Sequence, residues 1–337
     1  MTSPQYPGGG APDRVVPSLP DYDPDDQIEN AVISRLTANW HRRAMVKRPE
    51  PDLDELFEPD RPDYPEHLIP FREHPFYRAM DPEVRAHMLG WGWVAFNKHV
   101  MDTEQHVVNP TFSLVIQGTF DTGLDMETLS TAMTQAMLDE QYHTLMHLNA
   151  SSVMRRRRGW RMPESALPLG YKATRLRQRM AASEEPWQRD LSALAFATVA
   201  EISINSYLDL IAQDDEIQPI NKVTAVMHNR DEYCHSSIAD ELAKAVYDRL
   251  GPAQRALFRE AMVDGLEAFA ANSFGTWHRI VDLVGAEGGH EMLHEVEHDP
   301  SAKRLLSNFS GLHKFCAELD ILEELEFDWS TVTIEGP

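Results

Sequence analysis

Three residues with metal-binding side chains share one face of a predicted helix. The stretch HNRDEYCH places His228, Glu232 and His235 at spacings of four and three residues. At about 100° per residue, the three side chains fall within an arc of about 60°. A solvated helix face could carry such a triplet by chance, so the rest of the chain must decide between an ordinary surface and a metal site.

A second segment repeats part of this pattern. The stretch LDEQYHTLMH contains Glu140 and His143, which have the same spacing as Glu232 and His235. Two Glu-x-x-His motifs, with one glutamate from each of two other helices, are how four-helix bundles bind two metal ions. The sequence therefore predicts a two-metal centre whose remaining carboxylates come from two further helices.

Glu201 and Glu104 are the candidates for these two carboxylates. Glu201 lies in the apolar stretch LSALAFATVAEISINSYLDLI, where an unpaired ionised carboxylate would be costly and a bound cation would offset that cost. A protonated core glutamate is the alternative there. Glu104 has Asp102 and His106 as rival ligands in its own segment, and its assignment depends on the family pattern given below.

The charges and ligand types of the predicted site suit iron. Four carboxylates carry four negative charges, which two divalent ions would balance, and a mixture of carboxylate and imidazole ligands suits iron or manganese better than a metal that prefers thiolates. We expect two iron ions. His228 is a third imidazole, beyond the two of the usual bundle site. The predicted metal ligands are Glu104, Glu140, His143, Glu201, His228, Glu232 and His235.

Long periodic segments with few helix breakers predict an all-α fold, a helical bundle. Asp81-Pro82 and Asp125 are good helix starts, and Asn109-Pro110 is expected to end the first bundle helix. Strand signals are short and do not compete. Helices are expected at 26–46, 82–108, 125–157, 187–212, 219–249, 253–284 and 300–319.

The proline distribution and the helical pattern together divide the chain into four predicted parts. Twelve of the 22 prolines fall within the first 70 residues, which is typical of extended rather than helical chain. We expect a flexible tail at 1–25, an irregular wrapping segment with one helix at 26–80, the helical metal domain at 81–320, and a C-terminal tail at 321–337.

Composition excludes several partners. The chain has 31 basic and 54 acidic side chains and a net charge of −23, which argues against binding to nucleic acid or to an anionic membrane. Two cysteines are too few for a disulfide framework and agree with a reducing compartment. The first residues lack the apolar run of an export signal or membrane anchor. A cytoplasmic protein is expected.

The order of the motifs resembles that of the di-iron arylamine N-oxygenases, the p-aminobenzoate N-oxygenase family of antibiotic biosynthesis. The resemblance spans about residues 80–310 and depends on E-x-x-H at 140–143 followed by H-x-x-x-E-x-x-H at 228–235. Glu104 and Glu201 stand in the matching order and at similar separations. No local motif fixes the residues that contact the substrate, and no separate acid or base is assigned.

The resemblance has several implications for fold and activity. It implies a ferritin-like, homodimeric protein whose two iron ions use O2 as co-substrate and receive electrons from an external donor. The activity implied is conversion of an aryl amine, through hydroxylamine and nitroso intermediates, to an aryl nitro compound, with chloramphenicol biosynthesis as the specific pathway expected.

Other protein classes fit less well. A di-iron oxygenase that acts on carbon is the main alternative. The small subunit of ribonucleotide reductase has a radical tyrosine four residues after the first motif's histidine, where this chain has His147. An iron-storage protein would gain nothing from the third histidine. A non-enzymatic interaction protein would need matched Glu and His motifs to recur by chance.

A zinc protease is a more remote alternative. HEMLHEVEH, residues 290–298, contains two overlapping H-E-x-x-H matches, a pattern in which two histidines bind zinc and glutamate acts as a base. The segment has few apolar residues, however, and a catalytic zinc needs a third ligand. A solvated, acid-rich helix end is the preferred interpretation.

Overall fold

The computed structural model describes residues 33–299, 302–306 and 308–334. Within these ranges the chain forms helices, and its only β pairings are isolated bridges from Ala271 to Arg304 and from Asn308 to Thr333. The prediction of an all-α fold is therefore confirmed. The tail predicted at 1–25 and the first part of the helix predicted at 26–46 lie outside the described residues.

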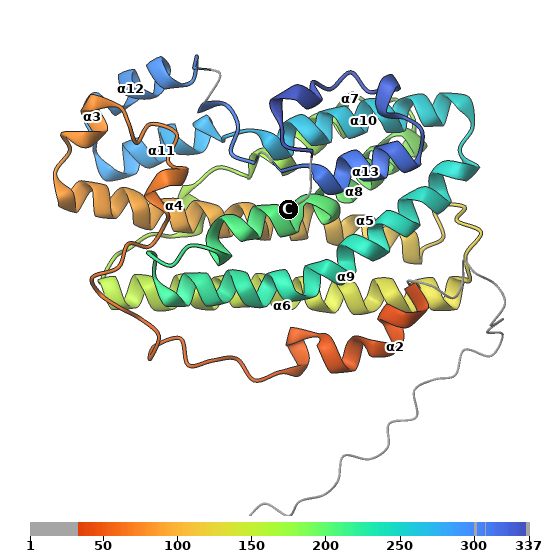
Figure 1. The fold of residues 1–337 in the computed structure, drawn as a ribbon, viewed down its shortest axis with the longest axis horizontal. Helices are drawn as coiled ribbons and strands as arrows, with labels where there is room; N and C mark the ends of the chain where they lie inside the picture. Colours follow the sequence, from red (N-terminus) through yellow and green to blue (C-terminus); the bar gives the residue numbers. More distant parts are fainter. Residues whose placement is uncertain (1–32, 300–301, 307, 335–337) are drawn as a thin grey trace, which may run out of the picture.

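Four long helices form the centre of the molecule: α4 (Pro82–Thr103), α6 (Met126–Arg158), α8 (Pro186–Ala212) and α9 (Pro219–Arg249). In Figure 1, α6 and α9 run side by side along the long axis. Helix α8 packs against α9, and α4 packs against α6. These bounds agree closely with the predicted helices, except at the end of α4.

Cap residues explain where two of these helices begin. A carboxylate oxygen of Asp81 accepts the backbone N–H of Glu83 at 2.8 Å, and Asp125 accepts the backbone N–H of Thr128 at 2.7 Å. Each acidic cap satisfies a free N–H group and also complements the positive end of the helix dipole.

Shorter helices surround the four long ones (Figure 1). Helix α2 lies against α6 and α9, α10 and α7 lie against α8, and α11 lies against α4. Helix α7 was not predicted. The surrounding α-helices are α2 (Ile33–Arg43), α3 (Pro75–Arg78), α7 (Tyr171–Ala182), α10 (Pro252–Ala270), α11 (Phe274–Val284), α12 (Gly289–Val296) and α13 (Ser310–Glu318).

The first bundle helix does not end at Asn109-Pro110, so this prediction is wrong. After α4 the chain widens into a π-helical turn, η3 (Glu104–Val108), and continues as α5 (Asn109–Ile116). The backbone N–H of Asn109 bonds to the carbonyl of Glu104, five residues earlier. The wider turn accommodates Pro110, which has no N–H to donate. Such π turns are frequent at functional sites.

The helix predicted at 253–284 is two helices, α10 and α11, separated at residues 271–273. The segment after residue 301 fills this break, because the N–H of Asn272 donates to the carbonyl of Lys303 at 2.8 Å and its side-chain amide donates to Ala302. Of the helix predicted at 300–319, the described part is helical only in α13. Long-range pairing therefore overrides the local helical pattern.

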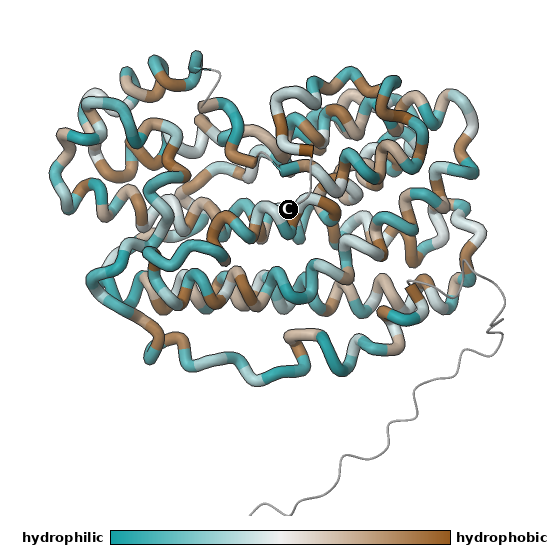
Figure 2. Tube along the Cα trace, viewed as in Figure 1, coloured by the Kyte–Doolittle hydropathy of each residue, from teal (hydrophilic) through white to brown (hydrophobic). Residues whose placement is uncertain are grey.

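Helix α8 is the apolar centre of the protein. It is long and apolar enough to cross a membrane, yet 83% of its most apolar window is buried by the rest of the chain, which is also what a core helix shows. Figure 2 shows hydrophobic and hydrophilic residues alternating along the other long helices, as expected for helices with one buried face.

Candidate metal centre

The seven predicted ligands converge in the interior of the four long helices. Each of the seven side chains is at most 2% exposed. They form two groups in which one ligand atom per residue lies within 4.8 Å of all the others. The first group contains Glu104, Glu140, His143, His228 and Glu232, and the second contains Glu140, Glu201, Glu232 and His235.

Glu140 and Glu232 belong to both groups. They come from facing helices, α6 and α9, and the i, i+3 spacing puts each on the same face as its histidine. Glu201 comes from α8, and Glu104 begins the π turn η3. This is the arrangement expected when two carboxylates bridge a pair of ions and the other residues bind one ion each.

Unpaired buried atoms show that the cluster fits metal ions. Oxygens of all four glutamates, and Nδ1 of His235, lack a hydrogen-bond partner. Nδ1 of His235 lies only 2.7 Å from Oε1 of Glu140, yet neither atom has a hydrogen bond of acceptable geometry. Buried polar atoms without partners are costly, and ligand atoms that converge on common points are satisfied when those points hold cations.

Two outer carboxylates orient two of the histidines. His143 points Nδ1 at Glu140 and Glu232, at 3.0 and 3.1 Å, and its Nε2 lies 3.3 Å from Asp231. His235 likewise has its Nε2 3.2 Å from Asp139. A carboxylate that accepts the far N–H fixes the tautomer and leaves the near nitrogen free to bind a metal. Both histidines are thus set to ligate through Nδ1.

His228 presents the opposite nitrogen. Its Nε2 lies 2.7 Å from Glu232 and 3.7 Å from Glu104, while its Nδ1 lies 2.9 Å from Nε2 of His147. Nδ1 of His147 in turn lies 2.6 Å from the side-chain oxygen of Asn97. Since that oxygen only accepts, neutral His147 donates to Asn97 and accepts from His228. The relay leaves the Nε2 lone pair of His228 directed at the cluster.

The pKa shifts follow from four carboxylates sharing one buried volume. Burial, and then Glu140, raises the pKa of Glu104 well above its usual range, and the pKa of Glu201 rises for the same reasons. Burial also tends to raise the pKa of Glu140, but His235 and His143 outweigh this and hold it at about 2. The cluster needs positive charge, from protons or metal ions, to stay together.

The N-terminal segment completes the site from outside the bundle. The indole Nε1 of Trp40 donates to both carboxylate oxygens of Asp139, and the backbone N–H of Met45 donates to Asp231 at 3.1 and 3.2 Å. The sequence-based prediction missed Asp139 and Asp231. A signal existed, because both motifs read Asp-Glu-x-x-His and the aspartate precedes the ligand each time.

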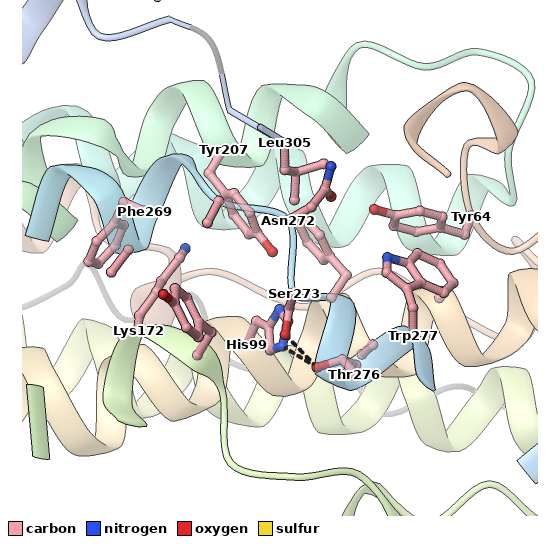
Figure 3. Close-up of a pocket in the computed structure, with 16 residues that line it drawn as sticks. Tyr64, His99, Lys172, Tyr207, Phe269, Asn272, Ser273, Thr276, Trp277 and Leu305 are labelled. Carbon is pink, nitrogen blue, oxygen red and sulfur yellow. Dashed lines mark hydrogen bonds between the residues drawn. The ribbon is translucent and has the colours of Figure 1, made fainter. Parts of the chain in front are cut away.

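A small pocket, drawn in Figure 3, is lined by residues other than the seven of the cluster. Lys172 projects into it with Nζ 3.9 Å from the Tyr207 ring and 4.3 Å from the Phe269 ring. Burial lowers the pKa of Lys172 to about 7, and the charge of Glu104 acts against that shift. His99 also lines the pocket, and burial lowers its pKa to about 4. Six of its sixteen lining residues are aromatic, and the charge of Lys172 interacts with that of Glu104, a predicted metal ligand.

The H-E-x-x-H stretch lies elsewhere, on the short surface helix α12. The side chains of His290 and His294 are 50% and 67% exposed, whereas Met292 and Leu293 are buried. A catalytic zinc helix is normally buried, and α12 is not. The solvated helix end expected from the sequence is therefore what the structure has.

Comparison with known proteins identifies the family. The family model described as P-aminobenzoate N-oxygenase AurF matches residues 26–320. The chain belongs to the p-aminobenzoate N-oxygenase family. A 4-aminobenzoate N-oxygenase from Streptomyces thioluteus is 34% identical over 309 residues, which cover 90% of this chain and 91% of the relative.

Membership of the p-aminobenzoate N-oxygenase family confirms the predicted fold and enzyme class. The protein is an all-α, ferritin-like di-iron monooxygenase. The buried carboxylate and histidine cluster is compatible with that centre. The zinc protease, a remote alternative from the sequence, has neither family membership nor a buried site in its favour.

Proposed function

We propose that the seven buried residues hold two iron ions, with Glu140 and Glu232 bridging them. The observation that carries this proposal is the overlap of the two ligand groups at those two glutamates. On this assignment Glu104, His143 and His228 serve one ion. Glu201 and His235 serve the other.

The proposed reaction is the O2-dependent conversion of an aryl amine to an aryl nitro compound through hydroxylamine and nitroso intermediates. The bound irons supply the reduction and activation of O2. Nitrogen gains an oxygen atom from O2, the other oxygen leaves as water, and an external donor provides the electrons and protons that the amine does not. Support comes from the relative named 4-aminobenzoate N-oxygenase. An oxygenase that acts on carbon remains the alternative.

The chain's own residues would position the amine. In the pocket of Figure 3 the Lys172 ammonium covers one face of the Tyr207 ring and one face of the Phe269 ring, so an aryl ring would pack on these residues only after Lys172 moves, with Lys172 then available to an acceptor group on that ring. The rings of Phe96 and Tyr207 stack at 4.8 Å, and Phe96 also lies 6.4 Å from the ring of His147. Phe96 therefore connects the lining of the pocket to His147, the hydrogen-bond partner of His228.

The setting of this enzyme is also a proposal. We propose a cytoplasmic homodimer that acts in antibiotic biosynthesis, specifically in the chloramphenicol pathway, with a separate protein or small reductant as electron donor. The acidic composition, with a net charge of −23, gives no support to a nucleic-acid or anionic-membrane partner.

The decisive experiment begins with anaerobically reduced, iron-loaded protein. Oxygen is admitted with either 4-aminobenzoate or the aryl amine precursor of chloramphenicol, and mass spectrometry follows hydroxylamine, nitroso and nitro products. We expect about two irons per chain and oxygen transfer to nitrogen. The Glu232→Gln variant, which keeps the side-chain shape but loses the bridging charge, should bind less iron and form no product. Products oxygenated on carbon would instead support the alternative oxygenase.

A further inference from the structure

A second cluster of metal-binding side chains lies at the surface, where α11 meets α12. His278 comes from α11, His294 from α12, and Glu297 directly follows α12. One ligand atom from each of the three residues lies within 4.8 Å of the other two. Their side chains are 24%, 67% and 28% exposed. The cluster therefore differs from the buried centre in its residues, helices and access to solvent.

A relay of hydrogen bonds orients His278. Its Nδ1 lies 2.8 Å from Nδ1 of His290, and Nε2 of His290 lies 2.7 Å from Oδ1 of Asp282. Because a carboxylate only accepts, neutral His290 donates through Nε2 and accepts through Nδ1. His278 then donates through Nδ1, and its Nε2 carries a lone pair. In metal sites, a histidine ligand is commonly oriented by such a hydrogen bond from the nitrogen that does not bind the metal.

The lone pair of His278 faces another acceptor. Its Nε2 lies 3.7 Å from Oε2 of Glu297, and Oε1 of Glu297 lies 2.9 Å from Nδ1 of His294. A lone pair and a carboxylate at this separation repel each other, and a cation bound between them would replace the repulsion by attraction. Ligand atoms about 2.1 Å from a tetrahedral zinc ion lie roughly 3.4 Å apart, a value between the observed 2.9 Å and 3.7 Å.

We propose that His278, His294 and Glu297 form a zinc site, with solvent as the fourth ligand. Two imidazoles and one carboxylate with an open position are a known zinc ligand set. Zinc binds such nitrogen-rich sites more tightly than ferrous iron does. The site does not use the H-E-x-x-H pattern as a protease would, because His290 orients His278 instead of ligating.

Zinc at this site would join α12 to α11, the helix that contributes residues to the pocket of Figure 3. His278 directly follows Thr276 and Trp277 in α11, and both of those residues line the pocket of Figure 3. Linking α11 to α12 through the ion holds this wall in place. The bound zinc therefore stabilises the folded protein, and the stabilisation requires the three ligands.

The test measures zinc binding by the full-length, iron-loaded protein. Zinc is titrated in competition with a chromophoric chelator, iron is quantified in the same samples, and Tm is recorded with and without zinc. We expect the wild type to bind one more zinc per chain than His278→Asn, His294→Gln or Glu297→Gln. Zinc should raise the Tm of the wild type and leave that of these variants unchanged.

His298→Gln is the matched control. His298 lies one helical turn after His294, and its Nδ1 bonds only to the carbonyl of His294 in the described structure. This variant should bind the same zinc as the wild type. Any zinc that displaces iron at the buried centre does so in every variant and cancels in the comparison. Equal zinc binding by the wild type and the three ligand variants, or loss of it in His298→Gln, would overturn the proposal.

Discussion

The indole of Trp40 donates to both carboxylate oxygens of Asp139, at 3.0 and 2.8 Å, although the two residues are 99 positions apart in the sequence. Asp139 is fully buried and accepts from His235, a predicted metal ligand. The N-terminal segment thus reaches the metal centre through one intervening carboxylate. Besides covering the bundle, this segment helps to hold a carboxylate that orients a predicted metal ligand.

Replacing Trp40 by Phe should therefore weaken iron binding without unfolding the bundle. The change removes the N–H but retains most of the ring, so Asp139 loses the indole donor and holds His235 less firmly. Loss of such an outer partner typically costs about 10- to 100-fold in metal affinity or activity. Iron retention against a chelator would measure this.

Trp329→Phe is the control for that prediction. The indole N–H of Trp329 has no hydrogen-bond partner in the described structure, so its removal should leave iron retention unchanged. If both variants kept iron equally well, the contact between Trp40 and Asp139 would have no function at the metal centre.

The bridging assignment predicts different iron contents for two single substitutions. Glu140→Ala removes a ligand common to both groups, whereas Glu201→Ala removes a ligand of one group only. We expect Glu140→Ala to retain almost no iron and Glu201→Ala to retain up to about one ion per chain. Both should lack activity, as should His235→Ala. Equal iron contents in Glu140→Ala and Glu201→Ala would contradict the bridging role, and normal turnover would remove the residue from the site.

His147 should act as a positioning residue for His228. His147→Phe removes the acceptor for Nδ1–H of His228, while His147→Gln can still provide one. We expect iron affinity or activity to fall by about 10- to 100-fold in His147→Phe and to recover partly in His147→Gln. His228→Ala should keep the fold and lose iron or activity. Equal defects in the Phe and Gln variants would indicate a packing role for His147.

The clustering of the seven predicted ligands was predictable because their signal is local. Glu140 with His143, and Glu232 with His235, repeat one spacing on one helix face, and the apolar neighbours of Glu201 leave few other reasons for a charge there. The π turn at Glu104 was not predictable from Asn109-Pro110, which locally favours a helix end. The chain continues as helix beyond it because η3 and α5 both pack against α6 and α8, contacts that the local sequence does not specify.

The missed contacts share a different cause. Trp40 and Asp139 meet only after α2 has packed against α6 and α9, and no periodicity in either segment specifies the other. The split between α10 and α11 likewise depends on residues about 30 positions further on, where Asn272 bonds to Ala302. Helix propensity could not reveal a break that long-range hydrogen bonds impose.

The pH dependence of stability should reveal a buried carboxyl group that anchors the N-terminal segment. Burial raises the pKa of Asp63 from 3.8 to about 6, and the nearby Arg158 only partly opposes this. Folding therefore favours the protonated carboxyl, so its stabilising effect is lost as the pH rises from about 4 to about 6. The difference corresponds to roughly 3 kcal/mol at most, at 1.36 kcal/mol per pKa unit.

Asp63→Asn cannot titrate and should lack this pH-dependent loss. The variant also removes the ion pair between Asp63 and Arg158. Above the pH at which the wild-type carboxyl is fully ionised, this loss changes the unfolding free energy of the variant by a constant amount. The unfolding free energies of the wild type and of Asp63→Asn are therefore measured by urea denaturation between pH 4 and pH 7. The informative quantity is how steeply the difference between these two free energies changes with pH. Asp60→Asn, at an exposed position of the same segment, should show no such slope. A flat difference for Asp63→Asn would mean that the carboxyl is ionised in the folded protein throughout this range and that Arg158 outweighs its burial.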